Sequence, residues 1–154
     1  MNTPKNDVVY LREGIYEWPL QLAESLLANP VSWGPPTYVL GFGYIEEEKN
    51  APDQFDNFYQ LATCVNGYER HPDNYSKFVD SISDEVKAGH SLEKFSTQDL
   101  LDAVFIVCRQ ERFCDGLIRS YEPALRAMVQ EVVRRVHSDT PPIFLASKEP
   151  GKRA

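Results

Sequence analysis

Apolar positions recur every three or four residues along most of the chain, which is the spacing of one helical face. The pattern predicts a first helix over Trp18–Asn29, with Pro19 in its first turn and Asn29-Pro30 at its end. A second helix is predicted from an Asp53 cap to Asn66-Gly67. Both segments place leucine, alanine or aromatic residues on one side.

The third helical segment has the clearest amphipathic spacing, and Gly89 follows it as a stop signal. Its apolar positions are Tyr75, Phe78, Val79, Ile82 and Val86. Further along, Ser96 and Asp99 form a capping box that opens a nearly continuous apolar run from Leu100 to Cys108. A helix that is apolar on most faces is packed from several sides, so we expect this one at the centre of the core.

A last helix is predicted after a turn at Tyr121-Glu122-Pro123, with Pro123 in its first turn. Its apolar face runs from Leu125 to Val136, and its solvent side carries Arg126, Gln130 and Arg134. Asp139-Thr140-Pro141-Pro142 ends the helix. The apolar patch at 143–145 that follows is expected to rest on the core.

One segment has the composition of a strand rather than a helix. Thr37–Ile45 (TYVLGFGYI) is rich in β-branched and aromatic residues and contains two glycines, as a bent strand or small hairpin would. With 154 residues, the chain has the length of one domain. We therefore predict a mainly α single domain over residues 1–146, a bundle of about five helices with a short strand or hairpin near Thr37–Ile45. We expect the first ten or so residues to be frayed and residues 147–154 to form a flexible tail.

Motifs for cofactor or metal chemistry are lacking in the sequence, so we expect no cofactor, no metal and no catalytic residue. His71, His90 and His137 lack metal-site spacing, and the three cysteines contain no CxxC pair. An odd number of cysteines behind an N-terminus without a secretory signal favours reduced thiols and a cytoplasmic protein. The sequence also contains no apolar run long enough to span a membrane.

The densest group of reactive side chains is RQERFCDG, residues 109–116. On a continuing helix, Arg109, Glu111, Arg112 and Asp115 fall at spacings that allow ion pairs, and Gly116 allows the close approach of another helix. The cluster is then structural. Alternatively, the two arginines form a pocket for a phosphate- or carboxylate-bearing ligand, beside Glu111 and Asp115. Cys114 has no neighbouring histidine to activate it as a nucleophile.

The same segment carries a resemblance. An apolar helix, the motif RQERFCDGL and a second amphipathic helix together resemble a bacterial family catalogued as domain of unknown function 6508, over about half of this chain. That family usually has a glycine between its last two helices, where this chain has Tyr121-Glu122-Pro123. The resemblance implies a mostly helical bacterial or phage protein and brings no activity. It singles out Arg109, Glu111, Arg112, Phe113 and Gly116 without a role.

The net charge of −7 disfavours direct binding of nucleic acid. An acidic block at Glu46, Glu47 and Glu48 adjoins a segment rich in aromatic residues, among them Trp33 and Tyr44. Tryptophan and tyrosine are favoured anchors at protein interfaces, so these five residues are the candidates for contact with a partner protein.

We therefore expect a non-enzymatic interaction protein. One concrete form is a small acidic phage or mobile-element inhibitor of a bacterial defence complex, similar to anti-CRISPR proteins, that covers basic sites meant for nucleic acid. The alternative is an enzyme or small-molecule-binding protein that uses the cluster at 109–115 on an anionic ligand. Association into a homodimer is a third prediction, because apolar faces are numerous for one core of this size.

Overall fold

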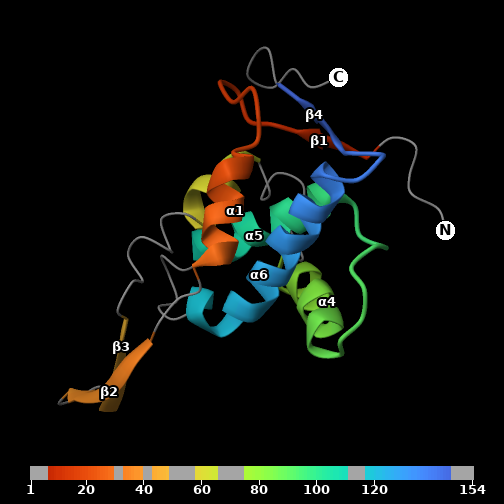
Figure 1. Cartoon of the computed structure of the whole chain (residues 1–154). Helices are drawn as coiled ribbons and strands as arrows, with labels where there is room; N and C mark the ends of the chain where they lie inside the picture. Colours follow the sequence, from red (N-terminus) through yellow and green to blue (C-terminus); the bar gives the residue numbers. More distant parts are fainter. Residues whose placement is uncertain are drawn as a thin grey trace.

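The computed structural model describes residues 7–29, 33–39, 43–48, 58–65, 75–110 and 117–146. The protein is mainly α-helical, as the sequence predicts (Figure 1). Its labelled helices are α1 (Leu20–Ala28), α4 (Tyr75–Lys87), α5 (Thr97–Gln110) and α6 (Leu117–Val136). Residues 58–62 are also helical and belong to the second predicted helix. Phe58, Leu61 and Ala62 of that segment are fully buried.

Helix α5 is the centre of the core. Every residue from Leu100 to Cys108 is buried, and the helix packs against α4, α6 and the N-terminal strand. Its start has the predicted capping bond, in which the Asp99 N–H donates to Ser96 Oγ at 3.1 Å. The expectation of a central helix is confirmed, and the physical reason is its lack of a polar face.

Helix α4 covers part of this centre. Val79 and Ile82 are buried at helical spacing, and the helix packs against both α5 and α6. The chain leaves α4 at Gly89, whose φ of +75° lies in the left-handed region that favours glycine. The predicted stop signal therefore acts where the sequence places it.

Helix α6 corrects one prediction, because it is continuous from Leu117 to Val136 and contains Pro123 in its interior. A turn at Tyr121-Glu122-Pro123 is therefore wrong. An interior proline costs about 3 kcal/mol, and the proline here is exposed. The apolar face beyond it is buried through Ala124, Leu125, Met128, Val129 and Val132. A single buried leucine contributes about 1.5–3 kcal/mol, so the stripe outweighs the proline.

Residues 8–10, which we expected to be frayed, form strand β1 (Val8–Tyr10). They pair in parallel with β4 (Ile143–Leu145), and Val8 lies opposite Ile143. The Ile143 N–H donates to the Asp7 carbonyl at 2.8 Å, and the Leu11 N–H donates to the Leu145 carbonyl at 2.9 Å. The two ends of the described chain thus lie side by side, above the helices in Figure 1.

The apolar patch at 143–145 rests on the core through one residue. The Phe144 ring stacks on Trp18 with ring centroids 6.0 Å apart and planes 3° apart. Ile143 and Leu145, on the other face of β4, are exposed. This alternation is that of a strand with one covered face.

Strands β2 (Trp33–Val39) and β3 (Gly43–Glu48) form an antiparallel pair, which we name the hairpin. It confirms the strand or hairpin predicted near Thr37–Ile45 and extends it at both ends. The two strands pack mainly against each other, and Figure 1 shows the hairpin standing apart from the helices. The remaining labelled elements form one helical body.

Candidate functional site

The buried guanidinium of Arg135 is bound on all three of its nitrogens. Arg135 is 9% exposed, near the end of α6. Its Nη2 donates to the Leu92 carbonyl at 2.9 Å, its Nη1 to Thr97 Oγ1 at 3.0 Å, and its Nε to Glu131 Oε2 at 2.7 Å. Three separate donors of one side chain thus bind two different segments and its own helix.

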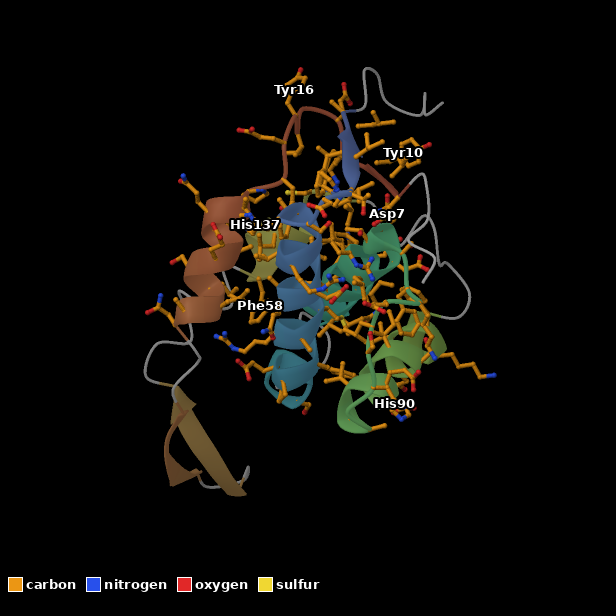
Figure 2. All side chains as sticks on the ribbon, turned by 45° about the vertical axis from the view of Figure 1, so that its right-hand side comes forward. Asp7, Tyr10, Tyr16, Phe58, His90 and His137 are labelled. Carbon is orange, nitrogen blue, oxygen red and sulfur yellow. The ribbon has the colours of Figure 1, made fainter. Side chains whose placement is uncertain are left out.

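Asp7 completes the charge balance around Arg135. Its Oδ2 lies 3.7 Å from Arg135 Nη1 and also accepts a short hydrogen bond from Thr97 Oγ1. Its Oδ1 accepts from the Thr97 N–H at 3.1 Å. A carboxylate at the first turn of α5 also interacts favourably with the helix dipole. Figure 2 shows Asp7 beside the start of α5, where β1 begins.

A second hydrogen-bond chain begins one residue further along α5. Gln98 Oε1 accepts from the Tyr10 N–H at 2.7 Å, and Gln98 Nε2 donates to Asp102 Oδ1 at 2.9 Å. Both Gln98 and Asp102 are buried. We name the whole set the polar network; its members are Asp7, Thr97, Gln98, Asp102, Glu131 and Arg135. Its hydrogen bonds join β1 to α5 and α5 to α6, so the network holds these three elements together.

Glu131 lies between two arginines. Arg134 donates to it through Nε at 2.9 Å and Nη2 at 2.6 Å, and Arg135 donates through Nε. Burial raises the pKa of Glu131, but the hydrogen bonds from Arg134 and Arg135 outweigh burial and hold that pKa below its ordinary value of 4.5. The carboxylate is therefore charged at neutral pH.

A surface depression of about 320 Å³ lies beside this ion pair. It is lined by His90, Ser91, Leu92, Ala127, Gln130, Glu131 and Arg134. Figure 2 shows His90 beyond the end of α4. The Arg134 guanidinium is held on two nitrogens by Glu131, so the cation that would attract an anion here is already neutralised. The depression does not favour an anionic ligand.

Arg126 has a role that the sequence did not indicate. We expected it on the solvent side of the last helix, but its side chain is 16% exposed and reaches the end of α1. Nη1 donates to the Leu26 carbonyl at 2.9 Å, Nη2 donates to the Asn29 carbonyl at 2.9 Å, and Nε binds Glu122. The guanidinium binds carbonyls at the C-terminus of α1, where the Leu26 carbonyl also accepts the Asn29 N–H at 3.2 Å. The Glu122–Arg126 spacing was the only sequence signal for it.

Of the charged cluster predicted at 109–115, the structure describes one member, Arg109. Arg109 lies exposed near the end of α5. Glu111, Arg112, Cys114, Asp115 and Gly116 lie outside the described residues. The choice between a structural ion-pair cluster and an anion pocket therefore stays a prediction.

The described cysteines are buried thiols. Cys64 is 4% exposed, and its Sγ lies 3.5 Å from the Gln60 carbonyl. Burial raises the pKa of Cys64 to about 11, although Arg12 lowers it in part. The thiolate is the nucleophilic form, so Cys64 is unreactive at neutral pH. Cys108 is 2% exposed in the centre of α5.

Among the described residues, two histidines pair with glutamates and belong to no metal-binding group. In that part of the chain, no group of three or more His, Cys, Asp and Glu side chains is placed to hold a metal ion. His90 Nδ1 instead lies 3.1 Å from Glu85, and His137 Nε2 lies 3.2 Å from Glu24. None of the helices among these residues has the length and apolarity needed to cross a bilayer.

The hairpin holds all five residues that we expected to contact a partner. Trp33 begins β2, and Tyr44, Glu46, Glu47 and Glu48 lie on β3. Trp33 lies opposite Glu48, and Tyr38 lies opposite Tyr44. These residues belong to the element that stands apart from the helical body (Figure 1). The polar network therefore lies within the helical body, whereas the aromatic and acidic residues of the hairpin lie outside it.

Three comparisons with known proteins gave no match to this chain. No family model matches the chain, and no curated protein or solved structure matches it significantly.

Replacing Arg135 by alanine should strongly destabilise the fold. Asp7, whose side chain is 10% exposed, would lose its Arg135 partner, and Glu131 would keep only Arg134. Removing one partner of a largely buried ion pair costs about 3–5 kcal/mol. The matched control is Arg134→Ala, because Arg134 binds the same Glu131 but is exposed, and its loss should cost less than about 1 kcal/mol. Urea unfolding followed by circular dichroism measures both. Equal losses of unfolding free energy in Arg135→Ala and Arg134→Ala would show that the buried hydrogen bonds of Arg135 add no more stability than an exposed ion pair.

Acidification should weaken the fold through Glu131. Its folded-state pKa lies below the ordinary value of 4.5, so its contribution is complete above about pH 4.5 and is lost as the pH falls through the folded pKa. In Glu131→Gln, the unfolding free energy should be lower at pH 7 and should fall less as the pH drops below 4.5, because the variant has no carboxylate to protonate at that position. Glu17→Gln, at an exposed position, is the control. An unchanged acid dependence in Glu131→Gln would contradict this account.

Cys64 should resist alkylation in the native protein. We expect iodoacetamide at neutral pH to modify Cys64 only after denaturation, because the native thiol is buried and protonated. Peptide mass spectrometry measures the extent of labelling. The control is Gln60→Cys, which introduces a thiol at an exposed position one helical turn earlier. Labelling of both thiols at the same rate would refute the prediction.

Proposed function

We propose that this chain is a non-enzymatic protein-interaction protein whose hairpin, β2 and β3, contacts the partner. The observation that carries the proposal is the placement of the hairpin outside the helical body, together with the residues that it bears. A two-stranded hairpin alone is only marginally stable in water. A hairpin that packs mainly on itself among the described elements can gain additional burial from a partner.

The composition of the hairpin supports a protein partner. Tryptophan and tyrosine provide large contact area at low entropic cost, and Trp33, Tyr38 and Tyr44 all lie on its strands. Three consecutive glutamates end β3. With a net charge of −7, the chain would be attracted to a basic surface and repelled by phosphates.

Basic protein surfaces are commonly those that bind nucleic acid, because they must neutralise phosphates. An acidic hairpin that covers such a surface acts as an inhibitor of nucleic-acid binding. Inhibition of a bacterial defence complex, in the manner of anti-CRISPR proteins, is the narrowest form of the proposal and rests on charge and composition alone.

The chemistry of the helical body supports the same class. The polar network uses its charged groups to join β1, α5 and α6, and Arg134 beside the surface depression is bound by Glu131. Burial keeps the thiol of Cys64 protonated, with a pKa of about 11. Each of these groups has a structural explanation that requires no substrate.

Replacing the hairpin should abolish partner binding without unfolding the body. Residues 33–48 are exchanged for a Gly/Ser linker of equal length, and tagged protein is recovered from nuclease-treated cells that encode it. We expect partners rich in lysine and arginine with wild type and at least about tenfold less of them with the variant, a loss of about 1.4 kcal/mol. Circular dichroism should show the same helical signal, and Tm should change by less than about 4 °C.

Two results contradict the proposal. Equal recovery of the same partners by both proteins would place the contact elsewhere on the chain. A variant that loses its helical signal would show that the hairpin belongs to the folding core, contrary to its separate position in Figure 1.

A further inference from the structure

The hairpin contains a register shift that decides which of its residues share a face. From Pro36 to Trp33 the chain of β2 advances three residues, while the opposite positions on β3, Glu46 and Glu48, are two residues apart. The extra residue on β2 is a β-bulge. Because alternate residues of a strand lie on opposite faces, one extra residue moves everything beyond it to the other face.

The bulge brings Trp33 to the same face as the other aromatic positions. Tyr38 lies opposite Tyr44, and directly opposed residues share a face. Trp33 is five positions from Tyr38, an odd number, and would lie on the other face of a regular strand. Its pairing with Glu48 places it instead with Tyr44, Glu46 and Glu48. Pro36, opposite Glu46, shares this face. We name the set the aromatic–acidic face; its members are Trp33, Pro36, Tyr38, Tyr44, Glu46 and Glu48.

The opposite face has a different character. Thr37 lies opposite Ile45, and Val39 lies opposite Gly43. Glu47 falls on that face by alternation. The acidic block is thus divided by the register: two glutamates accompany the aromatic positions, and one does not.

Resting on the proposed function, we propose that the aromatic–acidic face binds an extended, arginine-rich segment of the partner protein. A guanidinium stacks over tryptophan and tyrosine rings and forms two parallel hydrogen bonds with a carboxylate. On this face Glu48 lies opposite Trp33, and Glu46 lies two residues from Tyr44 on the same strand, so each carboxylate has an aromatic residue as a neighbour. The lysine ammonium lacks the planar fork and stacks less well, so the face discriminates between the two cations.

The spacing of the glutamates defines the form of the segment. Glu46 and Glu48 are two residues apart on one strand, which is about 6.6 Å at about 3.3 Å per residue. An extended peptide presents alternate residues to one side at the same repeat. The face therefore fits arginines at every second position of a strand.

The test uses fluorescein-labelled synthetic peptides and the full chain, with fluorescence anisotropy as the measurement. One peptide alternates arginine with serine, a second replaces each arginine by lysine, and a third has the same composition as the first with its arginines in one block. We expect the alternating arginine peptide to bind at least about threefold more tightly than either of the others, as stacking and matched spacing require.

Charge reversals on neighbouring residues separate the face from general electrostatics. Glu46→Lys and Glu48→Lys should each weaken binding of the alternating arginine peptide by about tenfold, whereas Glu47→Lys makes the same change of charge on the opposite face and should weaken it less than about threefold. Tyr44→Ala should remove the preference for arginine over lysine, and Ile45→Ala should retain it. Circular dichroism checks that all variants keep the helical signal.

The outcomes distinguish this inference from the proposed function. Equal weakening by Glu46→Lys and Glu47→Lys, or equal binding of the arginine and lysine peptides, overturns the assignment of the face and its ligand. If the cellular partner is nevertheless lost on hairpin replacement, the interaction function stands and only the arginine-segment inference fails. If hairpin replacement and both reversals leave the partner bound, the two proposals fail together.

Discussion

One buried guanidinium joins parts of the chain that are distant in sequence. Arg135 on α6 binds Thr97 at the start of α5, the Leu92 carbonyl before it, and Asp7 at the N-terminal end. A buried arginine without carboxylate partners would be strongly unfavourable, so these segments must meet for α6 to pack. Asp7 also begins the pairing of β1 with β4, because its carbonyl accepts the Ile143 N–H. The network therefore couples the closure of the chain ends to the packing of the helices.

The same network binds the charged groups at the junction of β1, α5 and α6 to one another. Glu131 accepts hydrogen bonds from Arg134 and Arg135, and these bonds hold its pKa below the ordinary value of 4.5. The hairpin has the reverse character. It packs mainly on itself, and it concentrates aromatic and acidic residues outside the body. The polar network thus stabilises the helical body, and the recognition that we propose belongs to the hairpin.

Helices with a strong local signal could be predicted from the sequence. The amphipathic spacing of α4, the stop at Gly89 and the Ser96 cap of α5 depend on neighbouring residues, so the sequence contains the necessary information. Predictions failed where distant packing decided the outcome. Pro123 indicated a break, but α6 stays helical across the proline because the apolar face after it is buried. Arg126 had a solvent-side position by periodicity, yet α1 brings carbonyls within its reach.

The sequence by itself determined the helical class, the central apolar helix, the strand-forming segment and the acidic character of its end. These follow from periodicity, capping and charge, which act over a few residues. Only the tertiary structure decided the parallel pairing of β1 with β4 and the partners of Arg135, because both depend on contacts across most of the chain. It also decided the face of Trp33. A one-residue bulge reverses the alternation, and sequence spacing alone places this tryptophan on the opposite side.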